Sequence, residues 1–284
     1  MAAPMTAKER WLAALRMQAV DRLPFWPKIL SAYPPAQAEP FRSMPLADIH
    51  RWIGSDRHEG LGAVATLRQR RYRTETLSVP NRREVLYHTP HRTLRRVSVF
   101  DADSQAWHPV VFPVANRDDL LALTEFYADA CVESDPEALA KARQRAAAIG
   151  QDALAACNIG TSALMDWVEH TAGVENAHLL LADYPDEVAA LFAVFDNLLV
   201  RKAEIALRES PADAFYLTEN TSTTLISPAQ FRRHALPTLR RCGEIARAAG
   251  KPLILHMCGH LRELLPDLGT LPVAAFEAFT SPTL

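Results

Sequence analysis

Hydrophobic residues in the second half of the chain follow a repeating order of short apolar runs and longer helical periods. Apolar runs that end in polar residues predict strands at 152–160, 213–220 and 273–279. A solid apolar stretch, Leu253–Leu255, predicts a further strand, buried on both faces as in a parallel sheet. Strands that alternate with helices imply a parallel sheet covered by helices. Because no glycine-rich nucleotide-binding motif is present, the pattern favours a (β/α) barrel over a doubly wound sheet.

Capping residues mark the starts of the expected helices. Thr6 and Glu9 form a capping-box pattern, which predicts a helix to about Gln18, and a short first strand is expected within 20–27. Similar start and stop signals predict the other helices. Asp183 is the expected cap of the longest one, over 185–209. The remaining helices are expected from Ser43 and Pro45 through Trp52, from Asn116 to about Ala130, from a Ser134–Glu137 capping box to about Ile149, over 162–170, over 174–181, and from Ser227 to Gly250.

Residues 67–114 depart from this order. Short β-type runs separated by turn residues predict an inserted antiparallel hairpin or small sheet, with strands at 75–79, 84–88, 93–100 and 107–114. The segment carries nine arginines against two glutamates, and a solvated edge that resists aggregation is favoured over a site for an anionic ligand. These arginines are Arg68, Arg70, Arg71, Arg73, Arg82, Arg83, Arg92, Arg95 and Arg96.

Composition is that of an ordinary globular protein. The 284 residues are 49% hydrophobic and 23% charged, with a net charge of −2, so we expect one domain over 1–284 and no nucleic-acid partner. Four widely spaced cysteines without a C-x-x-C pair indicate a reducing compartment. Because Lys8, Glu9 and Arg10 interrupt any leader and no stretch could span a bilayer, a cytoplasmic protein without a membrane partner is expected.

Candidate chemistry lies at the end of the apolar strand, in His256 and Cys258. Side chains alternate along a strand, so these two residues are expected on the same side, with Gly259 turning the chain away. An imidazole and a thiol at the C-terminal end of a barrel strand make half of a zinc site, in the place where barrel enzymes keep their chemistry. A buried cysteine beside a core histidine is the alternative interpretation.

Other polar residues at strand ends are expected to line the same mouth of the barrel and to bind substrate. For the two asparagines, loop capping is an alternative of equal weight. The expected substrate-binding residues are Trp26, Lys28, His58, Asn158, Glu219 and Asn220.

Four segments together resemble the uroporphyrinogen decarboxylase superfamily: KERWLAALRMQAVDRLPFWP, GVENAHLLLADYPDEVAALF, ENTSTTLISPAQFRRHALPTLRRCGEIARAAGKPLILHMCGH and VAAFEAFTSP. Its decarboxylases act without metal on a tetrapyrrole in porphyrin biosynthesis and carry arginines after the first strand. This chain reads FWPKILSAY at 25–33, without arginines. The His-x-Cys-Gly strand end is closer to the other branch, the cobalamin-dependent methyltransferases.

The resemblance implies a zinc-dependent methyltransferase. His256 and Cys258 would bind zinc, and Glu277, near the end of the next strand, would be a third ligand and a catalytic residue. The fourth position would be left to a thiol-type acceptor, and the methyl group would move between this thiol and the corrinoid of a partner protein. A lining carboxylate paired with a base is the alternative interpretation of Glu277.

The chain departs from the branch in one respect. The family's further cysteine ligand lies on the last barrel strand, whereas this chain contains about six of eight strands and lacks the last two, after about residue 280. An open barrel exposes strand edges, which homo-oligomerisation would cover. Two alternatives therefore remain: a decarboxylase-like lyase that uses the arginines of the inserted sheet, and a non-catalytic truncated family member.

Overall fold

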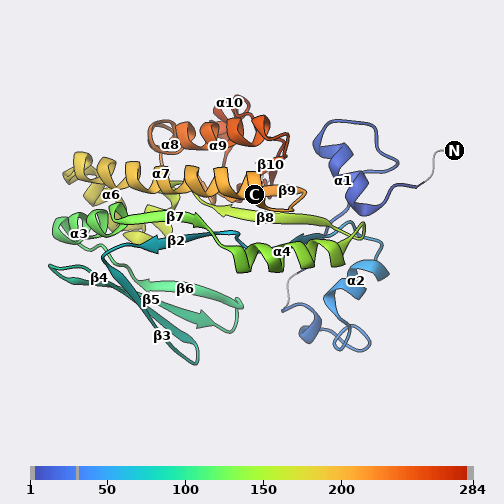
Figure 1. The fold of residues 1–284 in the computed structure, drawn as a ribbon, viewed down its shortest axis with the longest axis horizontal. Coiled ribbons are helices and arrows are strands. Elements are labelled where there is room, and N and C mark those ends of the chain that lie inside the picture. The colour runs from blue at the N-terminus through green and yellow to red at the C-terminus, as the bar shows by residue number, and fades with distance from the viewer. Residues whose placement is uncertain (1–3, 30–31, 280–284) are drawn as a thin grey trace.

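A five-stranded parallel sheet forms the centre of the computed structural model, which describes residues 4–29 and 32–279 (Figure 1). The strands are β1 (His58–Gly60), β8 (Leu154–Gly160), β9 (Ala214–Thr218), β10 (Leu253–His256) and β11 (Ala275–Glu277), in that spatial order. All four pairings are parallel. This sheet confirms the predicted fold class, a (β/α)-barrel type in which the described residues supply only part of the ring.

The expected first strand, 20–27, is wrong. Its described residues pair with no neighbouring strand. Phe25 bonds to Asp56 instead, accepting from the backbone N–H of that residue and donating to its carboxylate. Pro24 and Pro27 have no N–H to donate, so this stretch has too few donors to form a ladder. The described residues therefore contain five parallel strands, one fewer than expected.

Helices cover the sheet in the order that the sequence predicts. None in the described ranges is long and apolar enough to cross a membrane. Their bounds are α1 (Ala7–Leu15), η1 (Pro34–Ala36), α2 (Leu46–Trp52), α3 (Arg117–Ala128), α4 (Pro136–Ile149), α5 (Ala163–Asp166), the π-turn η2 (Trp167–Thr171), α6 (Val174–Asp183), α7 (Pro185–Glu209), α8 (Pro228–His234), α9 (Leu236–Ala248), η3 (Arg262–Leu264) and α10 (Leu265–Leu268).

Several predicted helix boundaries change for local reasons. The helix expected from Ser227 to Gly250 is two helices, because Pro237 begins a new one and cannot donate to the turn before it. Asp135, not Ser134, caps α4, and its carboxylate accepts from two backbone N–H groups. Asp183 ends α6 and gives no side-chain cap to α7. The capping boxes at Thr6 and Ser227 are confirmed.

Burial on both faces of β10 is confirmed. Leu253 and Leu255 belong to the main hydrophobic cluster on the helix side of the sheet. Ile254 faces the other side and packs with Leu15 and Leu154. The side chains of Leu253, Ile254 and Leu255 are each at most 2% exposed. This double burial fixes which residues end the strand, because a slip of one position would exchange its two faces.

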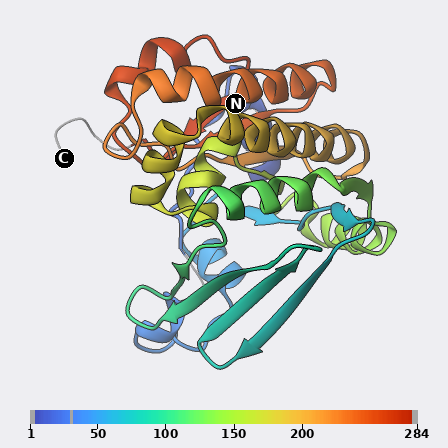
Figure 2. The ribbon, with the colours of Figure 1, turned by 90° about the vertical axis from the view of Figure 1, so that its left-hand side faces the viewer.

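The inserted sheet is also confirmed and lies beside the helical layer (Figure 2). It has four antiparallel strands, β3 (Arg73–Val79), β4 (Arg82–His88), β5 (Thr93–Asp101) and β6 (Ala106–Val111). Tyr87 of β4 packs edge-on against Phe126 of α3, which attaches the sheet to the body of the protein. A second antiparallel pair, β2 (Ala65–Gln69) with β7 (Ala130–Ser134), was not predicted.

Most arginines of the inserted segment are engaged by the protein itself. Five of the nine form ion pairs with carboxylates, and Arg83 lies over the ring of Trp107. Every residue of the edge strand β3 is exposed. These contacts favour the solvated-edge interpretation of the segment. The paired arginines are Arg68, Arg71, Arg82, Arg92 and Arg95.

A buried ion-pair network attaches the N-terminal segment to the sheet. Asp56, 1% exposed, accepts from Arg10, from Arg22 at 2.7 Å and from the backbone N–H of Phe25 at 2.9 Å. Asp21 binds the other side of the Arg10 guanidinium. This network positions the segment that carries Trp26 and Lys28.

Replacing Asp56 with alanine should therefore destabilise the fold by about 3–5 kcal/mol, because Arg10 would stay buried without its partner. The matched control is Asp48→Ala, which removes an exposed ion pair with Arg51 and should cost less than about 1 kcal/mol. Urea denaturation measures both. Equal losses in the two variants would show that the Asp56 network has no special structural role.

Candidate functional site

A cavity of about 310 Å³ lies at the C-terminal ends of the parallel strands. We call it the inner cavity. It contains six of the residues singled out from the sequence, from the N-terminal segment and four strands. The lining residues are Trp26, Lys28, His58, Gly60, Ala156, Asn158, Tyr216, Thr218, His256 and Glu277.

His256 and Glu277 face each other because β10 and β11 pair them in register. The Nδ1 atom of His256 lies 2.5 Å from Oε2 of Glu277, and Lys28 Nζ donates to Oε1 at 2.9 Å. Burial raises the pKa of the Glu277 carboxyl, but hydrogen bonds from Lys28 and His256 outweigh it and the net pKa is lowered. An ionised carboxylate only accepts, so Nδ1 of His256 carries the donated proton and Nε2 is the ring's acceptor nitrogen.

Cys258 does not join this pair. The strand ends at His256, Met257 is fully buried, and the exposed Cys258 has its Sγ 3.4 Å from Oδ1 of Asn220. No group of three His, Cys, Asp or Glu side chains in the described ranges is arranged to hold a metal. The predicted trio of His256, Cys258 and Glu277 is therefore assembled only in part.

Position 259 requires glycine because the chain there packs against the loop after β9. A Cβ atom on this residue would lie 2.3 Å from the carbonyl oxygen of Thr221 and 2.4 Å from Cβ of Ser222. The His-x-Cys-Gly segment thus leaves the sheet by packing against the loop after β9. The regular strand ends at His256, so the alternation expected between His256 and Cys258 has no strand to follow past this residue.

His58 forms the aromatic floor of the inner cavity. Its ring stacks on Trp26 at 4.1 Å, meets Trp11 edge-on at 4.3 Å, and has Nδ1 2.6 Å from the hydroxyl of Tyr216. The other ring nitrogen, Nε2, is buried without a hydrogen-bond partner among the described residues. Burial lowers the pKa of His58 to about 3, so its imidazole is neutral near pH 7.

Glu219 and Asn220 separate from the other predicted residues. Glu219 is fully buried, where it accepts from the backbone N–H and the hydroxyl of Ser162, and burial raises its pKa to about 7. Glu219 lines neither the inner cavity nor the second cavity, which lies beside it, so its predicted role in substrate binding stays a prediction. Asn220 lines a second cavity.

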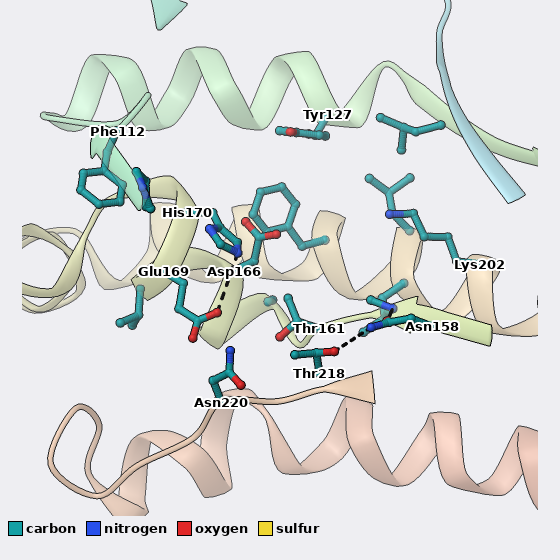
Figure 3. A pocket seen from close by; sticks show the side chains of 18 of the residues that line it. Phe112, Tyr127, Asn158, Thr161, Asp166, Glu169, His170, Lys202, Thr218 and Asn220 are labelled. Atoms are coloured by element: carbon teal, nitrogen blue, oxygen red, sulfur yellow. Dashed lines mark hydrogen bonds and ion pairs between the residues drawn. The ribbon is translucent and has the colours of Figure 1, made fainter. Parts of the chain in front are cut away.

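This second space, the outer cavity, has a volume of about 810 Å³ and lies between the inserted sheet, α3, α7 and the ends of β8 and β9 (Figure 3). Asn158 and Thr218 line both cavities and are joined by a 2.6 Å hydrogen bond. Sequence reasoning missed the outer cavity's charged residues. The segment Asp166–His170 was the available signal, since it places two carboxylates and an imidazole within five positions. Lys202 gave none.

Part of the chain is similar to a known protein family. Residues 162–279, which contain the His-x-Cys-Gly segment and Glu277, match the family described as uroporphyrinogen decarboxylase (URO-D). This part of the chain is similar to that family. The predicted resemblance is therefore confirmed over β9, β10 and β11, the strands that carry His256 and Glu277.

One curated protein and one solved structure that are similar to this chain are named as methyltransferases. A methylated-thiol–coenzyme M methyltransferase from Methanosarcina mazei is 28% identical over 113 residues, which are 40% of this chain and 30% of the relative's length. A solved structure, a methyltransferase from Methanosarcina mazei, aligns with 96% of this chain and 75% of its own, with a TM-score of 0.52 and 16% identity. The first agrees with the predicted methyltransferase branch, and the second supports the fold.

The low pKa of His58 predicts a pH effect on stability. A histidine whose folded pKa lies below its unfolded value opposes folding once the unfolded chain takes up the proton. Between about pH 6.5 and 3 the protein should therefore lose up to about 1.4 kcal/mol per pH unit through this residue. His58→Phe should flatten that slope, whereas a control at the exposed His91 should not. Urea denaturation at several pH values measures this, and parallel curves for parent and His58→Phe would contradict it.

Proposed function

We propose that this chain is a methyltransferase of the uroporphyrinogen decarboxylase superfamily whose reaction takes place in the inner cavity. The observation that supports this most is the His256–Glu277 pair. It lies at the C-terminal ends of neighbouring parallel strands, where barrel enzymes hold their reacting groups. The methyltransferase names of the relatives agree with it.

The finer proposal is that the methyl group moves between the corrinoid of a partner protein and a thiol-type acceptor. The similarity to a methylated-thiol–coenzyme M methyltransferase from Methanosarcina mazei supports a sulfur substrate. The inner cavity, at about 310 Å³, has room for a small thiol but not for a corrinoid as well. A corrinoid would therefore have to approach from outside the strand ends.

The predicted ligands are of the types that bind zinc, but they are not arranged around a common point. Imidazole, thiolate and carboxylate are all zinc ligands. In this structure, however, the ammonium group of Lys28 lies against both Glu277 and His256, and Cys258 contacts Asn220. A three-ligand site would need Lys28 to withdraw and the thiol to turn. Zinc is therefore proposed as a bound ion only, and no step of the reaction is derived from it.

His256 can handle the acceptor's proton in the arrangement described. Glu277 holds Nδ1–H of the ring, so Nε2 is left to accept the proton of an acceptor thiol, and the carboxylate stabilises the imidazolium that forms. A methyl-corrinoid on a partner protein would supply an electrophilic methyl group to this thiolate, and its cobalt would keep the electron pair of the broken cobalt–carbon bond. Asn158 and Tyr216 lie close enough to position a small acceptor.

Glu277→Gln should lower methyl transfer about 10- to 100-fold, since the ring of His256 loses the carboxylate that orients it. The assay uses methylcobalamin as donor and 2-mercaptoethanol as acceptor and follows the cobalamin absorbance. The control, Glu263→Gln, changes an exposed residue of η3 and should match the parent. A parent rate equal to the uncatalysed rate, or a Glu277→Gln rate equal to the parent's, would refute the proposal.

Metal content tests the zinc proposal separately. The parent, purified without chelator and supplied with zinc, should contain about one zinc per chain by elemental analysis, and Cys258→Ala should lose it because a three-ligand site without its thiolate binds weakly. Cys131→Ala, on β7, is the matched control and should keep the metal. No zinc in the parent, or equal zinc in Cys258→Ala, would remove the metal from the account without affecting the proposed roles of His256 and Glu277.

A further inference from the structure

The outer cavity contains one charged group whose partner is missing from the protein. Lys202 lines the cavity from α7, and no hydrogen bond or ion pair joins it to any residue of 4–29 or 32–279. Burial lowers its pKa, and the only opposing charge close enough to raise it is Asp166. A half-buried ammonium without a bonded anion is costly, so the site is suited to receive one.

The two acidic groups of the same cavity have contacts within the protein. Asp166 accepts from the hydroxyl of Thr171 at 2.8 Å, and Glu169 has Nε2 of His170 3.8 Å away. Figure 3 shows Glu169 and His170 toward one end of the cavity and Lys202 at the other. The outer cavity is therefore better suited to bind an anion beside Lys202 than a cation beside the carboxylates.

Aromatic side chains supply a wall for an apolar ligand body. Tyr127 of α3 and Phe195 of α7 both line the cavity and pack edge-on at 4.9 Å, which holds their rings in place. Trp107 and Phe112, from β6 and the residues after it, close the far side. A cavity that combines an apolar wall with charged groups can hold a small molecule with an apolar body and a charged end.

We propose that the outer cavity binds a small carboxylic acid, with its carboxylate against the ammonium group of Lys202 and its apolar body against Tyr127 and Phe195. A single negative charge fits because the cavity offers one ammonium and no arginine, while Asp166 and Glu169 repel further charge. This proposal goes beyond the proposed function and requires no methyl transfer. The shared residues Asn158 and Thr218 place the bound acid next to the inner cavity.

Isothermal titration calorimetry of the full chain tests this with 4-phenylbutyrate and its uncharged analogue 4-phenylbutan-1-ol. We expect the acid to bind at least about tenfold more tightly than the alcohol, from one charge-assisted hydrogen bond. Lys202→Met should abolish this difference while leaving alcohol binding unchanged, because it keeps the side chain's length and removes its charge. A thermal melt of each variant confirms that it is folded.

Lys28→Met is the matched control, since Lys28 is the cation of the neighbouring inner cavity. It should retain the parent's preference for the acid. Four results would overturn the proposal: no binding of the acid, equal binding of acid and alcohol by the parent, an unchanged preference in Lys202→Met, or a preference lost in Lys28→Met instead.

Discussion

The register of β10 against β9 and β11 is the constraint on which the site depends. Leu253 and Leu255 are buried in the main hydrophobic cluster and Ile254 in the cluster on the opposite face, so neither face of the strand is exposed to solvent. That register alone places His256 opposite Glu277, 21 positions later in the chain. A slip of one residue would bury the imidazole and separate it from the carboxylate. The packing of β10 thus fixes the geometry of the His256–Glu277 pair.

Local signals predict most of the fold. Capping residues give the starts of α1, α3 and α8, and alternating β-type runs locate the inserted sheet, because these signals act over a few residues. The errors arise where a single proline changes the backbone's donors. Pro24 and Pro27 prevent a first strand, and Pro237 divides the predicted helix. Each of these effects was present in the sequence but was outweighed there by the hydrophobic pattern.

The candidate site is predictable only as far as it follows strand ends. His58 and Asn158 meet His256 and Glu277 because parallel strands end at one edge, whereas Trp26 and Lys28 reach the cavity from the N-terminal segment, which pairs with no strand. Cys258 lies past the end of β10, beside Gly259, where the chain packs against the loop after β9. The outer cavity depends on how an inserted sheet packs against α3 and α7, and no local pattern around Lys202 reports that tertiary contact.

The most direct test of the account is removal and replacement of one imidazole ring. Methyl transfer from methylcobalamin to 2-mercaptoethanol would be measured for His256→Gly, with and without free imidazole. The account predicts a loss of about 100-fold or more, as expected for a lost general base, and a partial return when imidazole enters the vacated space. Full activity in His256→Gly would contradict the central claim that the His256–Glu277 pair carries the reaction.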